Sequence, residues 1–175
     1  VDDSNLVLRA AQAMGIDAVG FHLEKHLPAA AGIGGGSSDA AAALRLLAET
    51  TGAPLPADRG LSLGADVPVC LAARPARMSG IGEQVDPLPS LPLFGMVLAN
   101  PRVSVPTGAV FSALSSRDNA PMPARLPDWA DARAFARWLG EQRNDMEGPA
   151  RGIAPAIGVT LSRLGATDDC LLARM

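Results

Sequence analysis

The stretch from Leu27 to Ala43, LPAAAGIGGGSSDAAAA, constrains the fold of this chain more than any other segment. Its glycines at positions 32, 34, 35 and 36 let backbone N–H groups approach a bulky anion and make positive φ angles accessible without strain. Ser37, Ser38 or Asp39 can cap a following helix, whose first N–H groups favour a phosphate. The stretch therefore predicts either a nucleotide phosphate site or a flexible turn between a strand and a helix.

The segments on either side of the glycines predict which elements the loop joins. Apolar residues alternate at 19, 21 and 23, which is the period of a half-buried strand. From Asp39 to Thr51 an alanine- and leucine-rich run has helical spacing, and Gly52 closes it. We expect the order strand, glycine loop, helix.

Two common phosphate loops fit poorly. A P-loop needs a Lys-Ser or Lys-Thr pair after its last glycine, whereas Ser37-Ser38 follows Gly36 here. A dinucleotide fingerprint needs an acidic residue at the end of a second strand, and Asp58 lies instead in a Pro/Asp/Arg/Gly turn. Both alternatives are disfavoured.

Composition narrows the class of protein. A chain of 175 residues is long enough for one domain or two small lobes, and no apolar run approaches the roughly 20 residues that cross a bilayer. A net charge of -3 argues against non-specific nucleic-acid binding. Asp2 and Asp3 stand where a signal peptide would be basic, so we expect a cytoplasmic protein. We also expect a small-molecule partner, and a monomer or weak homodimer.

The cysteines and histidines of this sequence predict neither a disulfide bond nor a metal site. Cys70 and Cys170 lie in apolar surroundings, and a chain with a full core does not need to pair them. His22 and His26 have no Cys-x-x-Cys motif or acidic cluster nearby, so we expect no metal held by protein ligands alone.

Three further positions carry possible chemistry. Asp66 stands in Gly64-Ala65-Asp66-Val67-Pro68, where an aspartate is either a turn or cap residue or a positioned carboxylate. Thr107 follows an extended, proline-bounded segment and can cap a short helix that presents Phe111, which is either a core residue or an exposed ring. Lys25, the only lysine, is either an ordinary exposed charge or a phosphate contact.

Other segments predict scaffold, a boundary or caps. The expected elements are a helix after a cap at Asp3 or Ser4 that ends near Gly15, strands at 76–78, 94–99 and 170–173, and helices over 129–139 and 153–164. A proline-containing polar stretch over 115–128 predicts a linker or lobe boundary, and 144–147 predicts a helix cap.

The glycine loop resembles the phosphate loop of the galactokinase, homoserine kinase, mevalonate kinase and phosphomevalonate kinase superfamily. The matching residues are Pro28, Gly32, Ile33, Gly34, Gly35, Gly36, Ser37 and Ser38. Together with the Gly-Ala-Asp-Val-Pro segment and Pro101-x-Val-Ser-Val-Pro-Thr107, the Gly-Gly-Gly-Ser-Ser-Asp form resembles the 4-(cytidine 5'-diphospho)-2-C-methyl-D-erythritol kinases of bacterial isoprenoid synthesis.

The resemblance implies a two-lobed α+β small-molecule kinase fold. Residues 1–90 would belong to the ATP-binding lobe and 91–175 to the substrate-binding lobe. The implied reaction transfers a phosphoryl group from ATP, with Mg²⁺, to the 2-hydroxyl of the cytidine substrate. Another kinase of the superfamily, of homoserine or mevalonate type, and a non-catalytic nucleotide-binding regulator remain alternatives.

The resemblance also assigns roles to residues. Asp66 would be the general base and contact the substrate, Phe111 would stack on the cytosine ring, and Thr107 would lie in the substrate site. The nucleotide would contact Lys25 and the loop residues Pro28, Ala29, Ala30, Ala31, Gly32, Ile33, Gly34, Gly35, Gly36, Ser37 and Ser38. Family members further carry a catalytic lysine on an N-terminal strand and a glycine-serine loop near the C-terminus. This sequence offers no counterpart, so the resemblance implies that N- and C-terminal segments of the fold are missing from it.

Overall fold

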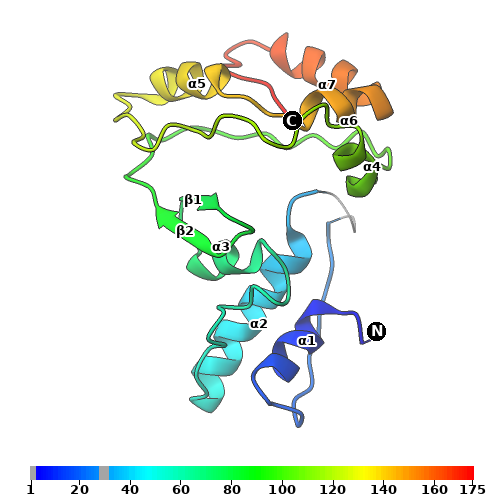
Figure 1. Ribbon diagram of the computed structural model, residues 1–175, viewed down its shortest axis with the longest axis vertical. Coiled ribbons are helices and arrows are strands. Elements are labelled where there is room, and N and C mark those ends of the chain that lie inside the picture. Colours follow the sequence, from blue (N-terminus) through cyan, green and yellow to red (C-terminus); the bar gives the residue numbers. More distant parts are fainter. Residues whose placement is uncertain (1–2, 28–31) are drawn as a thin grey trace. The chain divides into compact units, whose positions relative to one another are not determined.

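The computed structural model describes residues 3–27 and 32–175 and divides into two compact units, Val1–Pro89 and Ser90–Met175 (Figure 1). The first unit holds helices α1 (Leu6–Ala13), α2 (Gly35–Thr51) and α3 (Val67–Ala72) and strands β1 (Ala76–Ser79) and β2 (Gln84–Pro87). The second holds helices α4 (Thr107–Ser112), α5 (Ala132–Glu141), α6 (Glu147–Ile153) and α7 (Ala156–Gly165). Which lobe binds which substrate stays a prediction.

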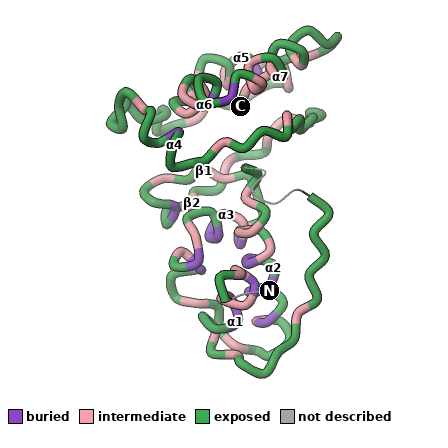
Figure 2. The backbone as a smooth tube through the Cα atoms, turned by 90° about the vertical axis from the view of Figure 1, so that its right-hand side faces the viewer, coloured by how far each residue is buried: buried purple, intermediate pink, exposed green. Residues whose placement is uncertain are grey.

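The core of the first unit lies where α1 and α3 pack on α2. Leu44 and Val67 are fully buried there, and Ala40 and Ala41 let the helices approach closely. Figure 2 shows buried positions on these helices. The first helix forms as expected, although its cap is Asn5, whose Oδ1 accepts a 2.9 Å hydrogen bond from the Val7 N–H, and not Asp3 or Ser4. This core fixes α2, the helix that follows the glycine loop.

Strands β1 and β2 form an antiparallel hairpin, with Ala76 opposite Pro87 and Ser79 opposite Gln84. The expected strand at 76–78 is therefore present. Its turn contains Gly80 and Gly82, both at positive φ, because a tight turn places residues in the left-handed region that glycine tolerates best.

Asp58 organises the turns between α2 and α3. Its Oδ1 accepts the Gly60 N–H and its Oδ2 the Ser62 N–H, both at 2.9 Å. Hydrogen bonds from Ser62 and then Gly60 hold the pKa of the Asp58 carboxyl below its ordinary value. The aspartate is thus a turn residue, in agreement with its exclusion from a dinucleotide site.

We expect the stability of the first unit to depend on Asp58 at acid pH. Because its pKa is lower in the folded protein, its contribution is present above the unfolded pKa, ~3.9, and is lost as the pH falls through the folded value. Asp58→Asn should flatten this part of the pH dependence, measured by urea unfolding between about pH 2 and 5. An unchanged slope in the variant would contradict the assignment.

The expected strand at 19–23 is wrong. Residues 19–26 are irregular, and Val19 and Leu23 are 37% and 39% exposed. A strand needs backbone hydrogen bonds from a neighbour, and in the described part of the chain the only ladder is β1 with β2. The alternating apolar residues at 19, 21 and 23 indicated that one side of this segment would be buried, but they did not identify a partner strand.

In the second unit, α5 carries an aromatic cluster. The Phe135 ring lies 5.5 Å from Phe94 and 4.8 Å from Trp129, and Trp129 lies 5.1 Å from Trp138. Asp131 caps α5, accepting the Ala134 N–H at 2.7 Å. The expected helix near 129–139 is therefore present from Ala132.

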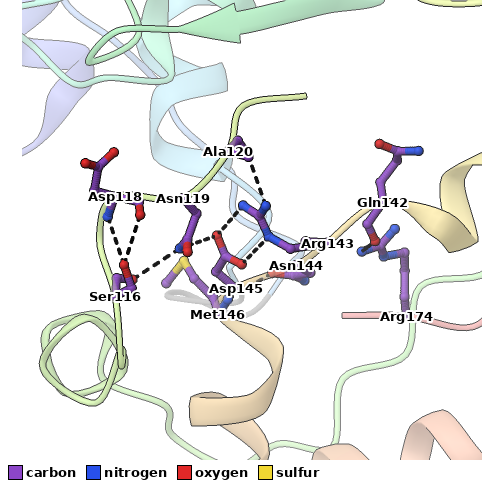
Figure 3. Close-up of polar contacts among 10 residues, drawn as sticks. All are labelled: Ser116, Asp118, Asn119, Ala120, Gln142, Arg143, Asn144, Asp145, Met146 and Arg174. Atoms are coloured by element: carbon purple, nitrogen blue, oxygen red, sulfur yellow. Dashed lines mark hydrogen bonds and ion pairs between the residues drawn. The ribbon is translucent and has the colours of Figure 1, made fainter. Parts of the chain in front are cut away.

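Polar contacts join residues 116–120, the start of α6 and the last residues of the chain (Figure 3). The linker or lobe boundary expected over 115–128 is wrong, because this stretch lies inside the second unit and the two units divide between Pro89 and Ser90. Asp145 pairs with Arg143 at 3.0 Å and accepts the Asn119 amide at 3.1 Å. Asn144 accepts the Met146 N–H at 3.2 Å, and Met146 is the N-cap position of α6. The segment 144–147 therefore leads into a helix as expected, but no side chain of the described residues makes a capping hydrogen bond there. Arg174 donates to the carbonyls of Leu139 and Gln142 at the end of α5.

Two more expected strands are wrong. Residues 94–99 and 170–173 are irregular, and Met96, Val97 and Leu98 are 71–75% exposed. Within the residues that the structure describes, no segment pairs with either stretch. The helix expected over 153–164 begins later, at Ala156. Ile153 is the last residue of α6, and Pro155, which has no N–H to continue a helix, is the N-cap position of α7.

Candidate functional site

Helix α2 begins directly in the glycine loop. Its N-cap is Gly34, in the left-handed conformation at φ 68°, and no side chain of residues 3–27 or 32–175 caps the helix. The expected cap at Ser37, Ser38 or Asp39 is wrong, because glycine reaches this conformation freely and the helix starts ahead of those residues. With no side-chain cap, the first N–H groups of α2 and its positive dipole end are available to an anion.

Much of the predicted nucleotide loop lies at this end of α2. Gly35, Gly36, Ser37 and Ser38 form its first turn, and Ile33, 46% exposed, precedes Gly34. Gly32 also has a positive φ, 74°. The predicted contacts Pro28, Ala29, Ala30 and Ala31 lie outside the described residues.

The structure brings Asp66 to the same place. Asp66 is the N-cap position of α3, and a Cβ built on Gly34 would lie 3.8 Å from its Oδ2. A Cβ built on Gly64 would lie 3.6 Å from the Ser37 hydroxyl oxygen. Asp66 is exposed and its side chain makes no capping bond, so the turn-or-cap interpretation does not account for the carboxylate.

Lys25 also reaches α2. Its Nζ lies 2.8 Å from Oδ2 of Asp39, and the two side chains are 46% and 30% exposed. The only lysine of the chain is therefore at the loop end of the helix, although its described partner is a carboxylate.

Arg45, which sequence reasoning missed, anchors the helix that carries Asp66. Its Nη1 donates to the carbonyls of Cys70 and Leu71, at 3.0 and 3.3 Å. Burial, and then the negative charge of Asp66, raises the pKa of the Cys70 thiol, which disfavours its thiolate form. The side chain packs against the core of the first unit. An arginine at an exposed position of an alanine-rich helix gives no signal in the sequence.

Thr107 and Phe111 lie on α4 in the second unit. The N-cap is Pro106 and Thr107 is the first helical residue, so the expected threonine cap is wrong. Phe111 is 46% exposed whereas its neighbour Val110 is 2% exposed. The helix packs through Val110, and the core alternative for Phe111 is not supported.

The histidines and cysteines form no binding site among the described residues. Glu24 lies 3.1 Å from His22 and 3.5 Å from His26, with all three side chains mostly exposed. Among the described residues, no three His, Cys, Asp or Glu side chains gather to hold a metal ion. Cys70 and Cys170 are free thiols. Over the ranges 3–27 and 32–175, no helix has the length and apolar character needed to span a bilayer.

The structure thus brings the glycine loop, the start of α2 and Asp66 together. The family model described as "GHMP kinases N terminal domain" matches residues 5–76, which include the loop and Asp66. Residues 5–76 are thus similar to the N-terminal domain of GHMP kinases, and the expected α+β fold class is confirmed.

The chain is also similar to 4-diphosphocytidyl-2-C-methyl-D-erythritol kinases. It is 57% identical to that of Dinoroseobacter shibae over 98% of this chain and 59% of the relative. It is 57% identical to that of Cereibacter sphaeroides (strain ATCC 17025 / ATH 2.4.3) over 100% of this chain and 64% of the relative. A crystal structure of a 4-(cytidine 5'-diphospho)-2C-methyl-D-erythritol kinase matches with 34% identity and a TM-score of 0.66, covering 93% of this chain and 62% of that one. The chain thus spans about three fifths of these proteins' length.

Proposed function

We propose that the protein takes part in the ATP-dependent phosphorylation of the 2-hydroxyl of 4-(cytidine 5'-diphospho)-2-C-methyl-D-erythritol, a step of the non-mevalonate isoprenoid pathway. The observation that carries the proposal is the Asp66 carboxylate beside Gly34, at the uncapped start of α2. This arrangement puts a proton acceptor next to a site suited to phosphate. Similarity to kinases of this name supports the choice of substrate.

In the proposed reaction, the glycine loop and the N–H groups of α2 hold the ATP phosphates. The substrate hydroxyl oxygen attacks the γ-phosphorus, its proton passes to Asp66, and the bond to the β-phosphate oxygen breaks to release ADP. A positioned general base contributes about 10²–10⁴-fold. The remaining acceleration comes from alignment and from electrostatic stabilisation of the transferred group. Lys25, which pairs with Asp39 at this end of α2, would lie near the nucleotide.

The residues of the site fit Mg²⁺ bound with ATP. Mg²⁺ keeps several waters and binds through one or two carboxylates together with substrate phosphates, so the chain need supply few ligands. Asp66 is assigned to the hydroxyl proton in this proposal, so Mg²⁺ would be held mainly by the ATP phosphates and by waters. When bound, Mg²⁺ neutralises charge on the phosphate oxygens.

A coupled assay of ADP release, run with and without the cytidine substrate, tests the proposal. We expect release to depend on that substrate and cytidine nucleotides to compete with it. Turnover of homoserine or mevalonate without such competition would favour another member of the family. ATP binding without turnover of any of these substrates would favour the regulator. We further propose that the protein is cytoplasmic and that it is a monomer or a weak homodimer.

Phe111 provides a test of cytosine recognition. We expect Phe111→Ala to weaken binding of the cytidine substrate by roughly 1–3 kcal/mol, the worth of stacking a base on an aromatic ring, and to leave ATP binding unchanged. Isothermal titration with each ligand measures both effects. Because Phe111 is 46% exposed, its removal should cost little stability.

The neighbouring Val110→Ala is the matched control, because this side chain is 2% exposed and packs the same helix. We expect Val110→Ala to lower the melting temperature more than Phe111→Ala does. Unchanged substrate affinity in a folded Phe111→Ala protein would remove Phe111 from the site.

A further inference from the structure

The hairpin turn between β1 and β2 lies directly against the backbone that carries Asp66. Gly82 has φ 112°, and a Cβ built on it would lie 2.8 Å from the carbonyl carbon of Ala65 and even closer to its oxygen. Ala65 is the residue before Asp66. Backbone atoms cannot swing aside as a flexible side chain can, so this contact tolerates only glycine.

The turn itself is closed on both sides. Oε2 of Glu83 accepts the Ile81 N–H at 2.7 Å, and the Gly82 N–H donates to the Ser79 carbonyl at 3.3 Å. The Ser79 hydroxyl donates to Oε1 of Gln84 at 3.0 Å, across the last pair of the ladder. A side chain at position 82 would therefore press on Ala65 from a turn that its own hydrogen bonds hold in place.

The other side of the Ala65–Asp66 segment is also held. The Val67 N–H donates to the Gly64 carbonyl at 3.0 Å, and the Cys70 N–H to the Asp66 carbonyl at 3.1 Å. Arg45 binds the carbonyls at the end of the same helix, α3. The backbone at Asp66 is thus confined between the hairpin turn and α3.

We propose that Gly82 is a positioning residue for Asp66, and that the hairpin turn sets the placement of this carboxylate beside the glycine loop. The catalytic part of this inference rests on the proposed function. The structural part does not, because it concerns the backbone at Asp66 whatever the reaction.

The test compares Gly82→Ala with Gly15→Ala in the intact protein. Gly15 also has a positive φ, 67°, but a Cβ built there meets nothing within 4 Å, so this variant carries backbone strain without the collision. We expect Gly82→Ala to lower kcat at least tenfold with KM for ATP little changed, because a misplacement of about 1 Å can cost about 10²-fold. Gly15→Ala should stay much closer to the parent kcat.

Amide hydrogen exchange gives a readout independent of turnover. Gly82→Ala should speed exchange at Val67 and Cys70, whose N–H groups hold the Asp66 segment, and Gly15→Ala should not. If the parent protein shows no kinase turnover, the proposed function fails. The amide exchange rates at Val67 and Cys70 then test by themselves whether Gly82 positions the Asp66 segment. Equal effects of the two variants on kcat and on exchange would overturn the role of Gly82.

A second variant keeps the test decisive if Gly82→Ala does not fold. Glu83→Ala removes the acceptor of the Ile81 N–H and loosens the turn without adding a collision. We expect a smaller fall in kcat and faster exchange at Val67. A parent-like kcat and parent-like exchange in this variant would show that the turn does not position Asp66.

Discussion

Asp66→Asn should lower kcat by at least about 10²-fold and leave ATP binding nearly unchanged, because asparagine keeps the size of the side chain but cannot take the hydroxyl proton. The structure supports this separation of effects. The carboxylate lies beside Gly34, whereas the groups proposed to hold the phosphates are backbone N–H groups of the loop and α2. Steady-state kinetics, with a titration of ATP, measures both quantities.

Glu49→Gln is the matched control for Asp66→Asn. It makes the same change of charge on an exposed residue of α2, near the opposite end of the helix from Gly35. We expect near-parent kinetics. A kcat for Asp66→Asn within a few-fold of the parent would remove this aspartate from the mechanism, and a similar loss in Glu49→Gln would indicate a general charge effect.

Leu44→Ala should cost about 2–5 kcal/mol of unfolding free energy, the range for removing a large buried aliphatic side chain. Leu44 is 0% exposed at the centre of the contacts that α2 makes with α1 and α3. Truncation removes apolar contacts and leaves a cavity, because packed helices relax only partly. Urea unfolding followed by circular dichroism measures the change.

The control is Leu46→Ala, two residues further along α2. Leu46 is 53% exposed, so the same atoms are removed from the same helix without opening a cavity. We expect a change within about 0.5 kcal/mol. Similar losses for Leu44 and Leu46 would mean that α2 does not bury the face described.

Local chemistry predicted the elements that build the candidate site. The helix after the glycines, the strand near 76–78 and the first helix all form, because each is specified by short-range spacing and glycine positions. The second strand of the hairpin, β2, was not predicted. The exact caps were missed. Hydroxyl residues and aspartates compete for the N-cap, but at α2 the left-handed Gly34 takes it, and this depends on backbone conformation that composition does not show.

Long-range features could not be predicted in the same way. The strands expected at 19–23, 94–99 and 170–173 depend on a partner that alternation does not supply. Arg45 under α3 and Gly82 against Ala65 join segments far apart in sequence, and neither residue type stands out locally. That Asp66 lies beside the loop was expected only through the resemblance to a kinase family.

One helix serves both the core and the candidate site, which ties ligand affinity to folding stability. Leu44 and Leu47 bury the middle of α2, while its first turn forms the proposed phosphate site. A ligand that binds only the folded protein adds RT ln(1 + [L]/Kd) to its stability, about 2.7 kcal/mol at a concentration one hundred times Kd. Weakening the core therefore raises the concentration of nucleotide needed to hold the first unit folded, and saturating nucleotide can mask a damaged core in an activity assay.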